Sequence, residues 1–299
     1  MDRHNIVLNI FLTSLVPIVW GSTYLVTTEF LPPDAPLLAA VLRALPAGLI
    51  LIAFGRQLPT GGWWVRAALL GVLNIGAFFY FLFVAAYHLP GGVAALIMSI
   101  QPIIVLLYGV VLFGNAITAT QVLACVLAAV GVALVVLRPE AELNVVGVTA
   151  GLGGALSMAT GIVLTKRWGR PAGTSLLTFT GWQLAFGGAA LLPIALVYEG
   201  LPPVLTVRNW LGLGYLGLFG ALAAYALWFR GIERLPALSV SFISLLSPLS
   251  ATLLGYWFLN EQLNWLQLLG GVGVLGAVFL AQPNINLFAR FQRPRHGEA

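Results

Sequence analysis

Charged residues are scarce in this sequence: of its 299 residues, 8% are charged and 60% are hydrophobic. A soluble domain of this size carries about 25% charged residues, because its surface faces water. The composition therefore excludes an ordinary soluble protein and predicts a surface that faces lipid. Basic residues outnumber acidic ones, giving a net charge of +5. Their placement along the chain, described below, predicts membrane orientation and not nucleic-acid binding.

Residues that carry catalysis or bind metals are equally scarce. Cys125 is the sole cysteine, so no intrachain disulfide can form. The three histidines lie near the ends of apolar segments or in the tails, and all nine acidic residues lie in loops, tails or segment ends. Neither a metal site nor a catalytic triad can be assembled from such a set. We therefore expect no metal, no cofactor and no enzymatic activity, and keep a membrane-embedded enzyme as a minor alternative.

Long apolar runs are what the sequence has in abundance. Runs of about 20 apolar residues, the length that crosses ~30 Å of hydrocarbon, alternate with short polar breaks. Backbone at that depth must satisfy its hydrogen bonds internally, so each run is predicted to be a helix. No stretch shows the alternation that a membrane β-barrel requires. The prediction is an all-α integral membrane protein with ten transmembrane helices, at 6–27, 36–56, 63–88, 92–113, 118–137, 145–167, 174–198, 207–229, 236–258 and 263–282.

The basic residues lie mostly on one side of the predicted membrane. When the N-terminus is placed in the cytoplasm, eleven of them fall inside and only Arg138 and Arg208 fall outside. Such an excess of Lys and Arg in the cytoplasmic loops sets the orientation of membrane proteins. We therefore expect both termini to be cytoplasmic, which agrees with an even number of spans.

The two halves of the chain resemble each other. When residues 83–134 are shifted by 146, Gln101-Pro102 falls on Ser247-Pro248. The order of spans is the same in each half, and each half holds five. An odd number of spans per half forces the second copy to enter the membrane upside down relative to the first. The predicted architecture is therefore an inverted repeat.

Inverted repeats are typical of secondary transporters, whose solute site lies near the midplane where the halves meet. A device that opens alternately to two sides needs this symmetry, whereas a scaffold or an enzyme does not. We expect the first five-helix repeat at residues 1–139, the second at residues 140–285 and a basic cytoplasmic tail at residues 286–299.

Several motifs also resemble a known family. Trp20-Gly21-Ser22 in the first span is followed by Ala39-Ala40-Val41-Leu42-Arg43 in the second, and Leu259-Asn260-Glu261-Gln262-Leu263 follows the ninth. In this order, along nearly the whole chain, they resemble the EamA family of the drug/metabolite transporter superfamily. The resemblance implies ten helices in two inverted repeats, and exporters of amino acids and other small metabolites are well represented there. Two departures are Ser247, where the family often has Glu, and Asn115, where an acidic residue is expected.

Arg43 is the one charged residue that lies well inside a predicted span, away from its ends. It lies about seven residues from the outer end of that span, roughly 10 Å at 1.5 Å per residue. An intramembrane charge is costly unless it faces a partner or water. In one interpretation Arg43 faces the solute cavity and attracts a carboxylate or another acceptor. In the other it caps carbonyl groups freed by Pro46, or extends toward the interface.

Two prolines, Pro102 and Pro248, lie near the middle of their spans at positions that the repeat makes equivalent. Proline removes a backbone hydrogen bond and bends a helix, and the freed carbonyl groups must find other partners. Gln101 and Ser247 stand directly before them. We predict that both prolines are hinges and that the preceding polar side chains bind solute, with pure helix packing as the alternative.

Polar and aromatic residues recur on single faces of several spans, which favours the lining of a wet, amphipathic cavity. Serine and threonine alone would be ordinary contacts between helices, and Ser157 falls in a row with Gly153 and Gly161 that is typical of tight packing. The predicted solute-binding residues are Trp20, Tyr24, Arg43, Tyr80, Tyr87, Gln101, Ser157, Trp182, Tyr225, Ser244 and Ser247.

The absence of acidic residues from the spans bears on the cargo. Proton-driven exporters of cationic drugs typically use a buried carboxylate as proton carrier and cation partner. A neutral or zwitterionic cargo, moved without a proton relay, fits this sequence better. The predicted function is export of amino acids or similar metabolites by alternating access across a bacterial inner membrane. Its partners are the solute and the lipid bilayer, with no nucleic acid and no required protein partner; the alternative cargo is a drug or a nucleotide-like solute.

Overall fold

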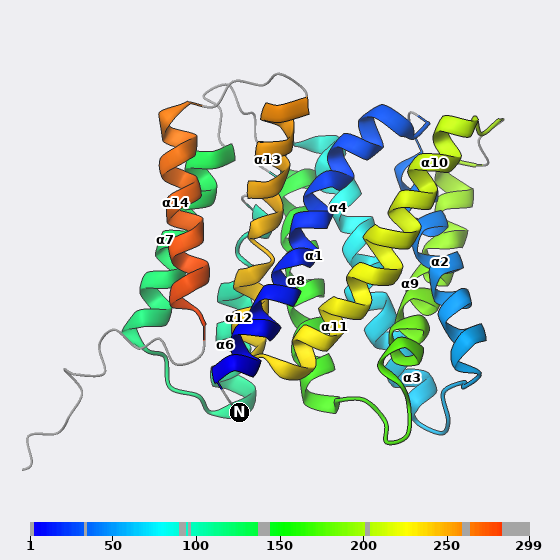
Figure 1. The fold of residues 1–299 in the computed structure, drawn as a ribbon, viewed down its shortest axis with the longest axis horizontal. Coiled ribbons are helices and arrows are strands. Elements are labelled where there is room, and N and C mark those ends of the chain that lie inside the picture. The colour runs from blue at the N-terminus through cyan, green and yellow to red at the C-terminus, as the bar shows by residue number, and fades with distance from the viewer. Residues whose placement is uncertain are drawn as a thin grey trace, which may run out of the picture.

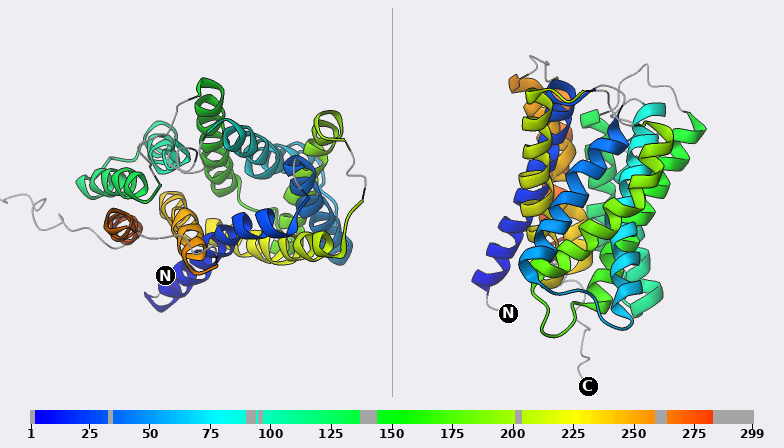
Figure 2. Two further views of the ribbon diagram at one scale, coloured as in Figure 1. Left: turned by 90° about the horizontal axis from the view of Figure 1, so that it is seen from above. Right: turned by 90° about the vertical axis from the view of Figure 1, so that its right-hand side faces the viewer.

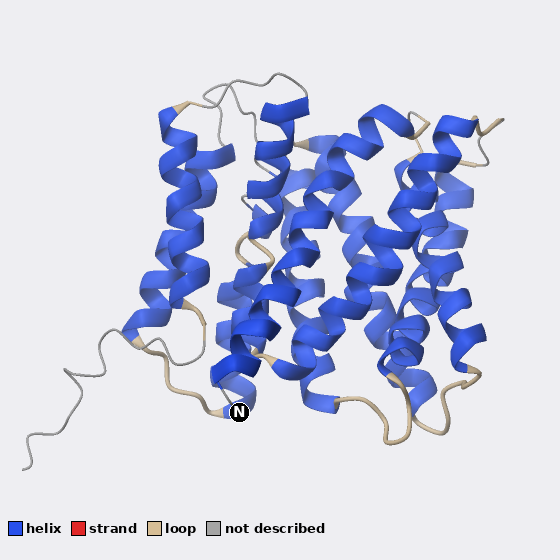
Figure 3. Ribbon diagram, in the orientation of Figure 1, coloured by secondary structure: helices blue, strands red, loops and turns tan. Residues whose placement is uncertain are grey.

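Helices make up the regular elements of the part of the chain that the structure describes (Figure 3). This computed structural model describes residues 3–32, 35–89, 94, 97–136, 144–200, 204–258 and 264–282. The elements are α1 (Arg3–Phe30), α2 (Pro36–Gly55), α3 (Trp63–Gly71), the π-helix η1 (Val72–Gly76), α4 (Ala77–His88), α6 (Gln101–Phe113), α7 (Ala119–Val136), α8 (Val145–Trp168), α9 (Leu176–Tyr198), α10 (Val207–Tyr215), the π-helix η2 (Leu216–Ala223), α11 (Ala224–Arg234), α12 (Ala237–Ile243), α13 (Leu246–Phe258) and α14 (Trp265–Leu280).

The helices run between two ends of the molecule (Figure 1). We call the end at which α1 begins the amino end and the end at which α1 stops the far end. Seven helices, some of them built from consecutive elements, are long and apolar enough to cross a membrane. Shorter apolar helices occur at Gln101–Phe113, Ala119–Val135 and Trp265–Leu280, each inside a predicted span. The start of the span predicted at 92–113 lies largely outside the described residues.

Large apolar side chains cover the outside of the helices. Phe54 is 85% exposed, Val111 77% and Val197 79%. Exposure of apolar surface to water costs about 25 cal/mol per Å², whereas lipid tails impose no such cost. The exposed surface is therefore built for the hydrocarbon of a bilayer, as the composition predicts.

Polar side chains cap the starts of several helices. The Asn144 side chain accepts hydrogen bonds from the first free N–H groups of α8. Thr206 with Asn209, and Asn264 with Gln267, form reciprocal capping boxes at the starts of α10 and α14. Each cap occupies backbone donors that have no partner inside the helix. These residues therefore decide where the apolar segments begin.

The described carboxylates serve helix ends. Glu199 accepts hydrogen bonds from two backbone N–H groups at the start of α2, both at 2.7 Å. Glu29 pairs with Arg208 at 2.9 Å near the far end, and Glu233 pairs with Arg170 at 2.9 Å near the amino end. The described acidic residues, Glu29, Glu199 and Glu233, thus have their partners at the rims of the helix bundle and not in its middle.

Helices from the two halves of the chain pack closely in pairs. α2 lies against α9, and α7 lies beside α14 at the opposite side of the molecule (Figures 1 and 2). Small residues form both contacts. A Cβ atom at Gly188 would come within 2.8 Å of the Leu45 Cβ atom, and one at Gly131 within 2.8 Å of the Gly270 carbonyl oxygen. Close approach through glycine is how membrane helices associate without a hydrophobic driving force.

The two π-helices interrupt two long helices at matching places. A shift of 146 maps Val72–Gly76 onto residues 218–222, which lie inside η2. A π-helical turn replaces the usual i→i+4 bonds with wider ones and recurs at functional sites. In each π-helix a backbone carbonyl accepts a bond from a side chain of another helix: Leu73 from Ser157 at 2.9 Å, and Gly220 from two residues described below.

The helical path is also interrupted beside both predicted hinge prolines. α6 begins one residue before Pro102, and α13 begins two residues before Pro248. Between α12 and α13, the Ser247 N–H donates to the Ser244 carbonyl at 3.0 Å, the i→i−3 bond of a tight turn. Each proline therefore lies in a first helical turn, where its missing donor leaves no gap. Motion at these points stays a prediction.

Candidate functional site

A cavity of about 410 Å³ lies between the two halves of the chain. Its walls come from α1, α2, α4, the turn before α6, α6, α8, η2, α11 and the α12–α13 turn. It extends from the middle of the helices to the far end, because Leu31 and Pro36, at the junction of α1 and α2, belong to its lining. Both halves therefore contribute to one compartment.

Arg43 carries the charge of this cavity. It projects from the middle of α2 and is only 8% exposed. Its Nη2 donates to the Gly220 carbonyl at 2.9 Å, and its Cζ lies 5.1 Å from the centre of the Phe79 ring. Of the described residues that line the cavity, no other is charged. The guanidinium is thus held by a neutral carbonyl and an aromatic face, without a carboxylate.

The π-helix η2 provides the acceptor that holds Arg43. The Gly220 carbonyl accepts from Trp20 Nε1 at 3.0 Å as well as from Arg43. A Cβ atom at Gly220 would stand 3.6 Å from the Arg43 guanidinium, in ordinary van der Waals contact, so Gly220 lies directly beside the cation. One carbonyl therefore joins α1, α2 and η2 around the floor of the cavity.

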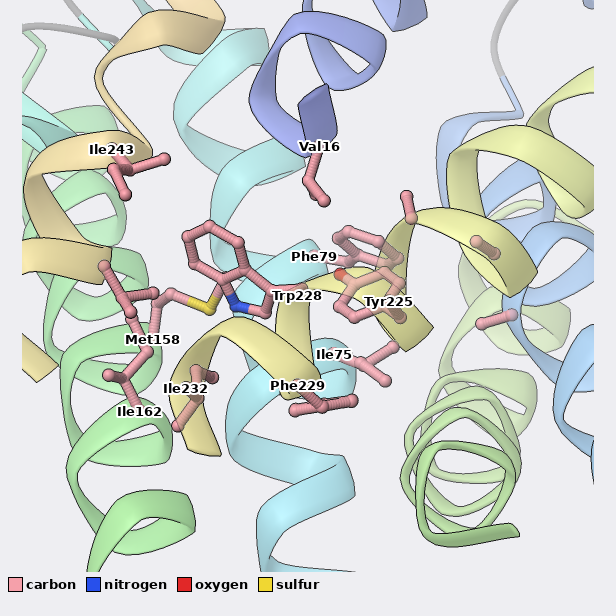
Figure 4. Packing of buried hydrophobic residues seen from close by; sticks show 14 of the residues in the cluster. Val16, Ile75, Phe79, Met158, Ile162, Tyr225, Trp228, Phe229, Ile232 and Ile243 are labelled. Carbon is pink, nitrogen blue, oxygen red and sulfur yellow. The ribbon is translucent and has the colours of Figure 1, made fainter. Parts of the chain in front are cut away.

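Packed aromatic and aliphatic side chains close the cavity toward the amino end. The Trp20 ring lies 5.1 Å from both the Tyr225 and the Trp228 ring centres. Figure 4 shows Trp228 between Met158 on one side and Phe79 and Tyr225 on the other. The cluster continues with Ile162, Phe229, Ile232 and Ile243, each of which is 0% exposed. The cavity is therefore closed toward the amino end of the bundle, whereas its lining reaches the far end.

Neutral polar groups face the cavity from other helices. Gln101 is 6% exposed, and its buried Nε2 has no hydrogen-bond partner in the part of the chain described. Ser244 lines the cavity while its hydroxyl donates to the Ser241 carbonyl at 2.7 Å. Thr23 and Thr27 line the α1 side. An apolar compartment with a few polar groups is typical of a small-molecule site.

Many of the residues predicted from sequence lie together in this cavity. They come from five different helical segments and meet only in the fold. The predicted residues that line it are Trp20, Arg43, Gln101, Tyr225, Ser244, Ser247 and Pro248.

Other predicted residues lie elsewhere. Ser157 packs between helices, where its hydroxyl donates to the Leu73 carbonyl. Trp182 lies near the amino end, where its Nε1 donates to the Gln57 carbonyl at 2.9 Å. Tyr80 stacks beside Phe81 at a ring distance of 5.6 Å and does not line the cavity.

The remaining predicted residue whose side chain the structure describes does not belong to the lining. Pro102 is buried but lies outside it. The side chains of Tyr24 and Tyr87 fall outside the described part of the structure.

The sequence analysis did not predict the apolar side chains that line the cavity, which we call the apolar wall. Phe78, Phe79, Phe83, Met98 and Met158 line the cavity. Their only signal is the spacing of four between Phe79 and Phe83, and apolar residues at that spacing are ordinary in a membrane helix. The described residues contain no group of three or more His, Cys, Asp or Glu side chains that could hold a metal ion.

Known proteins resemble this chain along most of its length. A sequence model of the EamA-like transporter family matches residues 7–137 and again residues 145–281. Protein PecM of Dickeya dadantii (strain 3937) is 49% identical over 274 residues, which cover 92% of each chain. The "probable amino-acid metabolite efflux pump" of Salmonella typhimurium is 26% identical over 288 residues, covering 90% of this chain and 93% of that protein.

A solved crystal structure has the same fold. It superposes with a TM-score of 0.77 over 97% of this chain and 99% of its own chain. Since its sequence is only 20% identical, the likeness concerns the fold alone.

Proposed function

The chain belongs to the EamA-like transporter family, and from this premise we propose that it exports amino acids or similar small neutral or zwitterionic metabolites by alternating access. It is a multi-pass membrane transporter of the drug/metabolite superfamily. The observation that carries the proposal is the central cavity, which both halves line and which packed side chains close toward the amino end.

We place the protein in the inner membrane of a bacterium. The proposed topology has ten membrane helices, with both termini in the cytoplasm. The seven long apolar helices and the three shorter ones support this number, because each of the ten overlaps a different predicted span. The arginine asymmetry of the sequence supports the orientation. Alkaline phosphatase, which is active only outside the cytoplasm, should be inactive when fused to the C-terminus. Strong activity of that fusion would overturn the topology.

The proposed repeats are residues 1–139 and 140–285, with opposite orientations in the membrane. Two observations support them: the family model matches once in each half, and the π-helices and proline breaks recur at equivalent positions. In such transporters one half moves against the other around a midplane site. The cavity at the junction of the halves is therefore the proposed solute site, and Pro102 and Pro248 are the proposed hinges.

The cargo proposal is tested by counterflow in sealed proteoliposomes. Vesicles loaded with one unlabelled amino acid should accumulate the same labelled amino acid, and a panel would rank the cargo. The printed name of the Salmonella relative supports an amino-acid metabolite. Selective exchange of a drug or a nucleotide-like solute, with no amino acid exchanged, would favour the alternative cargo.

Proton coupling is not part of the proposal, because no described carboxylate lines the cavity. Dissipating the proton gradient should leave downhill counterflow largely intact. Loss of exchange in vesicles that remain sealed would reveal a proton relay.

A further inference from the structure

The charge of Arg43 is unbalanced inside the cavity. The carboxylates of Glu29 and Glu233 are paired with Arg208 and Arg170 at the ends of the helices, and no described acidic residue lines the cavity. Removing a cation from water without a counterion is costly. The Gly220 carbonyl and the Phe79 ring offset only part of that cost, since they carry no formal charge.

We propose that the cavity selects its solute by a single carboxylate, which Arg43 binds, and that it does not recognise an ammonium group. The preferred class is thus a small organic anion with an apolar body, and an amino acid binds through its carboxylate alone. This inference rests on the proposed function, since it concerns the same cavity, and it names the chemical group by which that cavity distinguishes its cargo.

Unused donors near the cavity favour an anion. Arg43 Nη2 donates a hydrogen bond to the Gly220 carbonyl, while Arg43 Nε has no hydrogen-bond partner among the described residues. The Gln101 Nε2 is likewise a buried donor without a partner there. A carboxylate is an acceptor-only group, and its bonds to a guanidinium are among the stronger ones in proteins. A bound carboxylate would therefore supply both the missing charge and the missing acceptors.

The groups that hold the Arg43 guanidinium are not free to hold an ammonium group as well, and the other polar side chains of the lining, such as Thr23 and Thr27, carry no negative charge. The Gly220 carbonyl receives two donors, from Trp20 and Arg43. The Phe79 ring, which offers a face for a cation, already faces the Arg43 guanidinium. An ammonium group entering this cavity would meet the repulsion of Arg43 without a carboxylate to balance it. The zwitterion therefore gains little from its positive end.

The rest of the lining fits an apolar body. Trp20, Phe78, Phe83, Met98 and Tyr225 surround the space. Aromatic and thioether side chains pack against hydrocarbon or ring groups without needing hydrogen bonds. The cavity volume of about 410 Å³ accommodates a solute with one ring or a branched chain.

The test compares four probes that share a phenyl body and differ in charge. They are 3-phenylpropanoate, its neutral isostere 3-phenylpropanamide, phenylalanine and 2-phenylethylamine. Binding to the purified full-length protein is followed by tryptophan fluorescence, since Trp20 lines the cavity. We expect 3-phenylpropanoate to bind about tenfold more tightly than the amide, or better, because a charge-assisted bond is replaced by a weaker one. Phenylalanine should bind like 3-phenylpropanoate, and 2-phenylethylamine no better than the amide.

Variants assign this selectivity to Arg43. Arg43→Gln should lower the affinity for 3-phenylpropanoate to that for the amide, while Arg43→Lys should keep part of the difference. Arg208→Gln is the matched control: it removes an arginine that is paired with Glu29 at the rim, and the probe ranking should not change. Comparing probes on the unmodified protein needs no variant, so a folding defect in Arg43→Gln cannot hide the answer.

The outcomes separate this inference from the proposed function. If the amide or the amine binds as tightly as the anion, or if none of the probes binds, carboxylate selection is wrong even where labelled amino acids are exchanged in proteoliposomes. If the anion binds in an Arg43-dependent manner but no amino acid is exchanged, the proposed cargo is wrong and the carboxylate site stands.

Discussion

The two π-helices occupy matching places in the halves of the chain but have different surroundings. At η1, Asn74 fills the position that Gly220 occupies at η2, since 74 shifted by 146 is 220. Asn74 Nδ2 donates to Thr165 Oγ1 at 3.1 Å and to Gln183 Oε1 at 2.9 Å. Asn74 and Gln183 are 0% exposed, so this segment is locked inside the bundle.

At η2 the equivalent residue, Gly220, has no side chain that could bond to neighbouring helices. Its carbonyl faces Trp20 and Arg43, both of which line the cavity. The same backbone irregularity thus anchors helices in one half and positions a cation beside the cavity in the other. An inverted repeat can in this way specialise its halves: one π-helix is sealed by side chains and the other presents its carbonyl to the site.

Among substitutions at the two π-helices, we expect the largest effect on solute binding from a side chain introduced at Gly220. A Cβ atom there would already touch the Arg43 guanidinium at 3.6 Å, so the further carbon atoms of Gly220→Leu should displace the cation from its carbonyl. We expect the affinity for 3-phenylpropanoate to fall by at least about tenfold, because the charge-assisted contact is lost. Gly214→Leu is a control, since nothing lies within 4 Å of a Cβ atom there. Unchanged affinity in Gly220→Leu would separate η2 from the site.

Removing the polar network at η1 should affect stability and leave binding alone. Asn74→Ala deletes the donor to Thr165 and Gln183 and leaves the buried Gln183 amide without its partner. The free energy of unfolding should fall by about 1–2 kcal/mol, with the probe affinities unchanged. Reversible unfolding in mixed detergent measures the first and fluorescence titration the second. A double-mutant cycle with Gln183→Ala should return a coupling energy of about 1 kcal/mol; additive effects would argue against the network.

The two prolines should differ in their effect on solute affinity, because only one of them lines the cavity. Pro248 lines the cavity, whereas Pro102 is buried outside it. Pro102→Ala should slow counterflow several-fold at unchanged affinity, since alanine, unlike proline, would allow a continuous helix through the break before α6 and so stiffen it. Pro248→Ala should alter both the rate and the affinity. Wild-type rates and affinities in both variants and in the double variant would mean that these turns are ordinary packing.

The smallest expected difference is between Trp228 and Trp20, and it concerns the free energy of unfolding. Trp228 Nε1 is buried and has no partner among the described residues, whereas Trp20 Nε1 donates to Gly220. Trp228→Phe should change the free energy of unfolding by less than about 1 kcal/mol, since the loss of ring volume is offset by removal of an unpaired donor. Trp20→Phe should cost more, because it leaves a carbonyl acceptor short of one bond. Equal losses in thermal unfolding would contradict this difference.

The helical membrane class follows from composition and run length, because lipid allows few alternatives for the backbone. Arg43, Gln101 and Ser247 could be singled out from the sequence, and they line the cavity, because a polar side chain inside an apolar span needs a polar partner or water. Ser157 and Trp182 satisfy the same criterion but bond to backbone carbonyls away from the cavity. Sequence cannot distinguish a polar group that faces a cavity from one that faces a neighbouring helix.

The π-helices and the apolar wall could not be predicted. Val72–Gly76 and the segment around Gly220 read as ordinary apolar helix, since a π-helical turn has no residue preference strong enough to detect. Phe79 and Met158 look like any lipid-facing or packed side chain until the neighbouring helices are placed. Their role depends on tertiary contacts that periodicity does not encode.

The most direct test of the account asks whether solute passes through this cavity. The single native cysteine, Cys125, permits a cysteine-free background with Cys125→Ser, into which Ser247→Cys is introduced at the cavity lining. A membrane-impermeant thiol reagent should modify Ser247→Cys and abolish counterflow of labelled phenylalanine, and excess unlabelled phenylalanine should slow the modification. Complete modification with an unchanged rate of counterflow would show that the solute takes another path.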